Sequence, residues 1–189
     1  MVIERLKKLI GKDSVIKKAD VDRLKTLSSE QKEKELQSIL YELAFKDAAA
    51  FVYENLRRSD SPFSKLDRNL FFHEMLIINF WMMRKVFSKY KHDIAEKMHA
   101  HYFGSLSDIA EKTAALAPKM KAYNLCWDDY TGHHDEFGLK VGENLFGKDV
   151  LYPEKNISFW IITYTDDSIK KYKKLRKQCL EAGLIHKGE

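Results

Sequence analysis

Leu70 to Phe87 read LFFHEMLIINFWMMRKVF, and this stretch decides the fold because it carries apolar residues on nearly every side of a helix. A helix that is apolar all round is normally buried by its neighbours. The stretch therefore predicts a buried central helix over about 67–90. The polar residues that interrupt it each need a physical reason, and they are His73, Glu74, Asn79, Arg84 and Lys85.

The rest of the chain has the composition of a helical protein. Of its 189 residues, 44% are hydrophobic and 32% are charged, with only 8 Gly and 3 Pro, which argues against a disordered or an all-β chain. Ser28 and Gln31 form a capping-box pattern before a long helix that runs to Arg58. Further helical patterns lie over 4–10, 93–103, 109–127 and the segment before Gly183. We expect one all-α domain, residues 1–189, built as a bundle of about six or seven helices.

Three local signals bear on the later helices. Pro118 is expected to kink or split the helix that contains it. The spacing of Gly138 and Gly142 would let a short helix approach a neighbour closely. Residues 157–165, ISFWIITYT, are β-branched and aromatic enough for a strand. A single strand would have no partner in this sequence, so we interpret the segment as the buried start of a helix, with the strand left open.

The central helix has two different faces. One is a broad core face with Asn79 at its middle, and a buried amide there is expected to bond a backbone group, a polar side chain or a water. The other is a narrow apolar strip of Leu70, Ile77 and Trp81, edged with charge like the rim of an interface. The candidate interaction surface is Leu70, His73, Glu74, Ile77, Trp81 and Arg84. The alternative, which we favour for the strip, is that neighbouring helices of the same chain cover it.

A metal site is the second candidate chemistry. The segment 127–137, WDDYTGHHDEF, is the densest set of potential ligands in the chain. Imidazole and carboxylate ligands suit zinc, iron or manganese. A site completed in three dimensions would use His73, Glu74, His101, His133, His134, Asp135 and Glu136. The same residues around Gly132 are also typical of an exposed turn, which we favour, and no cofactor is predicted beyond a transition metal at such a site.

Charge and cysteine content limit the cellular compartment and the partners that we expect for the protein. Two cysteines are too few for a disulfide framework, and the N-terminus has no apolar core of signal-peptide length, so we expect a cytoplasmic protein. No apolar run approaches the ~20 residues of a membrane span. The net charge is +5, and the last helix carries a lysine stripe that can contact an anionic surface weakly: Lys170, Lys173, Lys174 and Lys177. No nucleic-acid recognition motif accompanies it, which argues against nucleic acid as a partner.

No sequence motif fixes the function. Our first expectation is a non-enzymatic helical protein that binds another protein or a second copy of itself. The alternative, from another class, is a metal-dependent enzyme or cofactor-binding bundle that uses the His, Asp and Glu residues of the central helix and of 127–137. Whether the protein is an enzyme is therefore open at this stage.

Overall fold

The apolar stretch forms the helix α4, Arg68–Phe87. A computed structural model describes residues 18–87, 109–127, 132, 134–147 and 154–185 of the chain. Asp67 caps α4, because its side-chain oxygen Oδ1 accepts the backbone N–H groups of Asn69 (3.0 Å) and Leu70 (2.9 Å). From Glu74 to Met83 every residue of α4 is buried.

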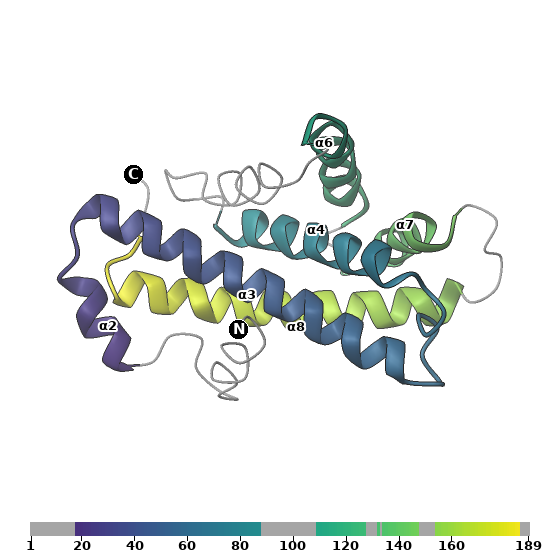
Figure 1. The fold of residues 1–189 in the computed structure, drawn as a ribbon, viewed down its shortest axis with the longest axis horizontal. Coiled ribbons are helices and arrows are strands. Elements are labelled where there is room, and N and C mark those ends of the chain that lie inside the picture. Colours follow the sequence, from purple (N-terminus) through teal and green to yellow (C-terminus); the bar gives the residue numbers. More distant parts are fainter. Residues whose placement is uncertain (1–17, 88–108, 128–131, 133, 148–153, 186–189) are drawn as a thin grey trace.

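Within the described ranges the chain forms six helices and no strand, so the all-α expectation is confirmed. Besides α4 they are α2 (Lys18–Lys25), α3 (Ser29–Arg57), α6 (Ile109–Cys126), α7 (Asp135–Phe146) and α8 (Glu154–Glu181). α4 contacts α3, α6, α7 and α8, and thus lies at the centre of the bundle (Figure 1). The single-domain organisation of residues 1–189 stays a prediction.

The long helices α3 and α8 lie on one side of α4 (Figure 1). α3 runs antiparallel to α4, since the ring of Tyr41 lies near Phe80 and the ring of Phe51 near Phe71. α8 runs parallel to α4, since Tyr164 bonds Asn79 and Arg176 bonds the carbonyl of Val86. The capping box predicted at the start of α3 is confirmed: Ser28 Oγ accepts the N–H of Gln31, and the Gln31 side chain accepts the N–H of Ser28.

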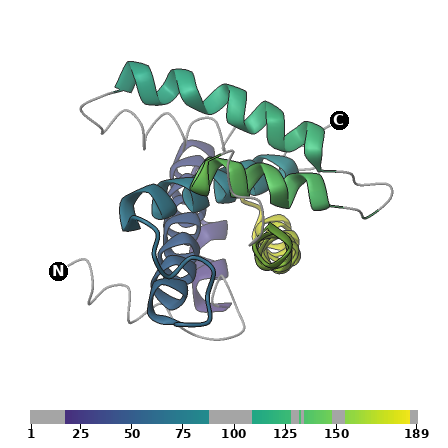
Figure 2. The ribbon, with the colours of Figure 1, turned by 90° about the vertical axis from the view of Figure 1, so that its right-hand side faces the viewer.

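Helix α6 is the outermost helix on the other side of α4, and α7 lies between α6 and α8 (Figure 2). α7 also packs on the first part of α8. A Cβ atom placed on Gly138 would lie 2.7 Å from Ser158 Cα of α8, whereas one on Gly142 would meet its nearest atom, of Ile157, at 3.4 Å. The close approach predicted from the two glycines is therefore present, and Gly138 is the residue that permits it.

Two expectations about single segments can now be judged. Residues 157–165 belong to α8, so they are helical, and the inward spacing of Ile157, Ile161 and Thr165 explains their apolar, β-branched character. Pro118 lies inside α6, which does not end there, so of the two expected outcomes the split is excluded and the kink stays a prediction. Pro118 is exposed, and because it has no N–H the helix lacks one backbone hydrogen bond at this position.

The amide in the core face of α4 is satisfied on both sides. Asn79 donates from Nδ2 to the carbonyl oxygen of Ala44 in α3 (2.8 Å), and its Oδ1 accepts the hydroxyl of Tyr164 in α8 (2.8 Å). It therefore joins the three long helices. None of the helices in the described ranges combines the length and apolarity that crossing a membrane requires. The helices expected over 4–10 and 93–103 lie outside the described residues.

Candidate functional site

The apolar strip of α4 is largely covered by the chain itself. Trp81 is only 1% exposed, and its indole ring contacts the rings of Tyr123 and Phe137, from α6 and α7. Ile77 is 8% exposed, while Leu70, at the start of the helix, is 43% exposed. A partner would have to displace α6 and α7 to reach the centre of the strip.

Glu74, expected at the rim of the strip, is instead buried in a polar network. Its side chain is 1% exposed, and Oε2 lies 2.5 Å from Lys119 Nζ of α6. Oε1 accepts hydrogen bonds from the Tyr123 hydroxyl and from Asn144 Nδ2 of α7 (2.8 Å). The Asn144 amide also donates to the Tyr123 hydroxyl (3.0 Å). Both carboxylate oxygens are thus occupied by donors from the two helices that cover α4.

The hydrogen bonds of this network join α4 to α6 and α7. Burial, the charge of Glu74 and the hydrogen bond to it raise the pKa of Tyr123 well above its usual range, so the phenol remains a donor to the carboxylate. The partners of Glu74 are 45 to 70 residues away in sequence. Lys119 and Tyr123 are four residues apart and therefore lie on the same face of α6. This spacing is the one local feature of the sequence that indicates a shared partner.

The structure does not bring the described members of the predicted metal site together. Within the described residues no three His, Cys, Asp or Glu side chains gather as a metal site. Glu74 is held by the network, His73 is half-buried beside the ring of Phe72, and His134 precedes α7. Asp135 and Glu136 are exposed in its first turn. His101 and His133 lie outside the described residues, so the metal hypothesis that includes them stays a prediction.

Three of the predicted site residues, together with Lys173 of the predicted lysine stripe, line one pocket of about 570 Å³ between α4 and α8. Trp81 and Arg84 come from α4, and His134 comes from the turn before α7. We call this hollow the cationic pocket. Its described lining is Trp81, Arg84, Lys85, Val86, Asn124, Trp127, Gly132, His134, Asp166, Ile169, Lys173 and Arg176.

Aromatic rings and polar groups form one wall of the cationic pocket. The rings of Trp127 and His134 are stacked, with centroids 3.6 Å apart and an interplanar angle of 10°. The Trp81 ring lies edge-on to Trp127 at 5.5 Å, and its Nε1 donates to Asn124 Oδ1 (2.7 Å). Nδ1 of His134 is buried and has no hydrogen-bond partner within the described structure.

Four of the lining residues carry positive charge, and one of them, Lys85, has its Nζ 5.9 Å from the centre of the Trp81 ring. Arg84 and Lys85 come from the end of α4, and Lys173 and Arg176 from the middle of α8. Asp166 is the one acid among the described lining residues. Arg176 Nη1 donates to the carbonyl oxygen of Val86 (3.2 Å), but its Nε is buried without a hydrogen-bond partner. An unsatisfied buried donor costs about 1–3 kcal/mol.

Sequence reasoning found part of this pocket. Arg84 was recognised as a charge beside the apolar strip, and Lys173 as one member of the lysine stripe. Arg176 was missed because it lies at the edge of the apolar face of α8, where a long basic side chain normally reaches water. Its proximity to Val86 depends on the parallel packing of α4 and α8, which no local pattern encodes.

No protein-family model, no curated protein and no solved structure matches the chain. The function must therefore be inferred from the side chains and their geometry.

Proposed function

We propose that this protein is a non-enzymatic binding protein and that the cationic pocket binds an anionic group. The observation that supports this proposal best is the clustering of Arg84, Lys85, Lys173 and Arg176 around one pocket with Asp166 as the described acid. Clefts lined mainly by one sign of charge concentrate ligands of the opposite sign. A volume of about 570 Å³ lies within the range of small-molecule sites.

Arg176 supplies the most specific part of the argument. One terminal nitrogen, Nη1, is held by the Val86 carbonyl, which orients the guanidinium. The edge formed by Nε and Nη2 has no hydrogen bond within the described structure. Two parallel N–H groups on one edge match the two oxygens of a carboxylate or phosphate. Nε is buried, so a ligand would engage it only after the guanidinium turns toward the pocket.

Tryptophan fluorescence tests the proposal. The chain has three Trp residues, of which Trp81 and Trp127 line the pocket and Trp160 does not. In the Trp160→Phe variant, acetate and inorganic phosphate are expected to change the emission in a saturable way that weakens as sodium chloride is added. The same titration with Lys173→Gln should require more anion. A flat response to both anions, or an unchanged response in Lys173→Gln, would overturn the proposal.

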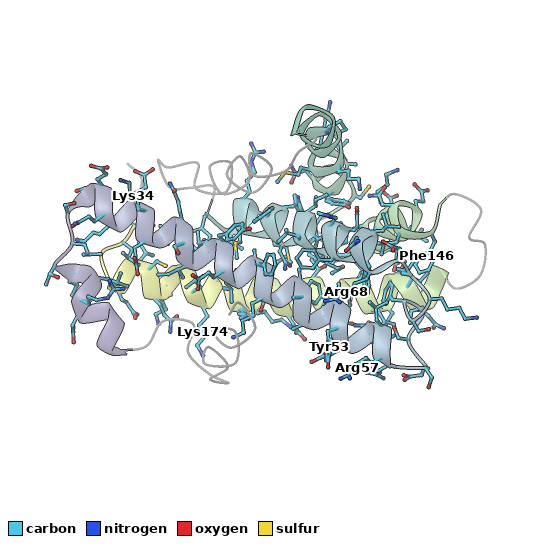
Figure 3. All side chains as sticks on the ribbon, in the orientation of Figure 1. Lys34, Tyr53, Arg57, Arg68, Phe146 and Lys174 are labelled. Atoms are coloured by element: carbon cyan, nitrogen blue, oxygen red, sulfur yellow. The ribbon has the colours of Figure 1, made fainter. Side chains whose placement is uncertain are left out.

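Lys174 provides the matched control. It belongs to the same exposed lysine stripe as Lys173, but it does not line the pocket and projects from the side of α8 away from α4 (Figure 3). Lys174→Gln removes the same charge from the same helix. Equal losses in the two variants would assign anion binding to the stripe and not to the pocket.

A second candidate function is binding to another protein molecule, and a groove between α3 and α8 favours it. The groove has a volume of about 620 Å³ and is lined by the aromatic side chains of Phe51, Phe159, Trp160 and Tyr164. Phe159 is 69% exposed. Large exposed aromatic side chains beside charged groups are typical of interfaces.

The charges along this groove suit a second copy of the chain. Acids and bases both line it: Asp47, Glu54, Asp167, Arg58 and Lys171. A twofold interface must be self-complementary, and a mixed set allows opposite charges to meet across the axis. Light scattering over a range of concentrations should show a dimer that Phe159→Ser dissociates. Leu125→Ser, at a side chain 76% exposed outside the groove, should leave the dimer intact. A wild-type monomer at all concentrations would exclude this candidate.

A further inference from the structure

The cationic pocket is too large and too varied for a simple ion. A tetrahedral ion of five heavy atoms is only a few water molecules in size, and each water takes about 30 Å³. The pocket, at about 570 Å³, is many times larger. Its lining also includes the apolar side chains of Val86 and Ile169 and two indole rings. An inorganic ion would therefore leave most of the pocket filled with water.

The free edge of Arg176 favours a planar anion. Nε and Nη2 of a guanidinium lie in one plane, and a carboxylate lying in that plane can accept a hydrogen bond from each. Val86 holds Nη1 from the other side, which limits the guanidinium to a small range of orientations. The amide of Asn124, whose Oδ1 is engaged by Trp81, leaves its NH₂ group as a further donor beside the pocket.

The aromatic rings that line the pocket favour a flat apolar body. Trp127 and His134 are stacked nearly parallel, and Trp81 lies edge-on to them. Aromatic side chains attract a further ring in offset-stacked or edge-to-face geometry.

The placement of Asp166 favours a single negative charge. Asp166 lies on α8 with Lys173 and Arg176, and it lines the same pocket. A carboxylate there opposes every negative charge that enters, so the second charge of a dianion gains less than the first. We infer that the ligand of the cationic pocket is an aromatic monocarboxylate, an inference that rests on the proposed anion-binding function.

Four probes separate the parts of this inference. Benzoate carries both the ring and the carboxylate, acetate lacks the ring, benzamide lacks the charge, and inorganic phosphate lacks both ring and planarity. In isothermal titration calorimetry, benzoate should bind at least tenfold more tightly than each of the other three. Benzoate no tighter than acetate, or no tighter than phosphate, would overturn the assignment of an aromatic acid. Binding of benzamide as tight as that of benzoate would overturn the role of the charge.

Three variants and one control, Lys174→Gln, test the residues that carry the argument. Arg176→Lys keeps the charge but removes the planar edge, and it should weaken benzoate binding about tenfold while weakening acetate binding by a similar factor. Lys173→Gln should weaken both several-fold, and Lys174→Gln should leave both within twofold. Asp166→Asn should strengthen benzoate binding several-fold, a gain that damage to the fold cannot produce. Unchanged or weaker binding in Asp166→Asn would contradict the electrostatic argument.

Failure of this inference differs from failure of the proposed function. If acetate and phosphate bind and respond to Lys173→Gln, but benzoate gains nothing, the pocket binds anions without an aromatic preference. If none of the three anions binds, both the proposed function and the aromatic acid are wrong. A thermal melt of Arg176→Lys without ligand identifies a folding defect, and Lys173→Gln, at an exposed side chain, keeps the test decisive in that case.

Discussion

Removing the carboxylate of Glu74 should destabilise the protein strongly, because three donors from two helices depend on it. Its side chain is 1% exposed, while that of Lys119 is 30% exposed and can turn to water once the pair is broken. The cost of Glu74→Ala therefore comes mainly from the buried Tyr123 hydroxyl, from the Asn144 amide and from the space left behind. Breaking a buried charge pair costs about 3–5 kcal/mol, and the exposure of Lys119 places this case near the lower limit.

The Glu74→Gln variant allows the electrostatic part of this loss of stability to be measured separately. The amide keeps the shape and one acceptor oxygen, which the Tyr123 hydroxyl can still use. Its NH₂ group, however, meets the donor groups of Lys119 or Asn144, so we expect a loss of about 1–3 kcal/mol. For a chain of this size each kcal/mol lowers the melting temperature by about 2–4 °C.

Urea denaturation of four proteins checks this prediction: wild type, Glu74→Gln, Lys119→Met and the double variant. If Glu74 and Lys119 are coupled, the loss of stability in the double variant is smaller than the sum of the losses in the two single variants, by at least about 0.5 kcal/mol. Glu54→Gln, on the exposed surface of α3, is the matched control and should change stability by no more than about 0.5 kcal/mol. Equal losses in Glu74→Gln and Glu54→Gln would refute the reasoning.

Three further variants or conditions have clear expectations. Gly138→Ala should lower the free energy of unfolding by about 1–3 kcal/mol, since its methyl group meets the backbone of Ser158, whereas Gly142→Ala should be neutral or stabilising; urea denaturation compares them. Ser28→Ala should cost about 1 kcal/mol through loss of the α3 cap, measured the same way. Alkaline pH should unfold the protein, because burial raises the pKa of groups that ionise near pH 9–10 when exposed: Tyr123, Tyr164, Tyr172 and Cys179, the last to about 12. Stability from these groups is complete below pH 9 and falls as pH rises above it. Tyrosinate absorbance should therefore rise together with loss of helical circular dichroism, and ionisation of all tyrosines before that loss would contradict the expectation.

Local chemistry made much of the fold predictable. The capping box at Ser28 acts over a few residues, so the sequence displays it directly, whereas residues 157–165 were assigned to a helix only because a single strand would have no partner. The need of Asn79 for partners was also predictable, because a buried amide without them is costly. The identity of those partners was not, since Ala44 and Tyr164 are 35 and 85 residues away.

The site was less predictable than the fold for the same reason. Periodicity separates the faces of α4 but does not say which helix covers each face. Both Glu74 and Trp81 were placed at a candidate surface, and the packing of α6 and α7 buries them. Arg84, near the end of α4, stays exposed beside the cationic pocket.

The polar residues of α4 thus form two groups, which differ in the helices that pack beside them. Asn79 faces α3 and α8, and Glu74 faces α6 and α7, so each is saturated by groups of the protein itself. Arg84 and Lys85 lie where α4 ends, beside α8 and the turn before α7, and there the helices enclose a pocket and not a packed core. A polar group inside the bundle fixes which helices pack together, whereas the charged groups at the end of α4 line a pocket. In this protein the binding site is therefore expected at the end of the helix that organises the core.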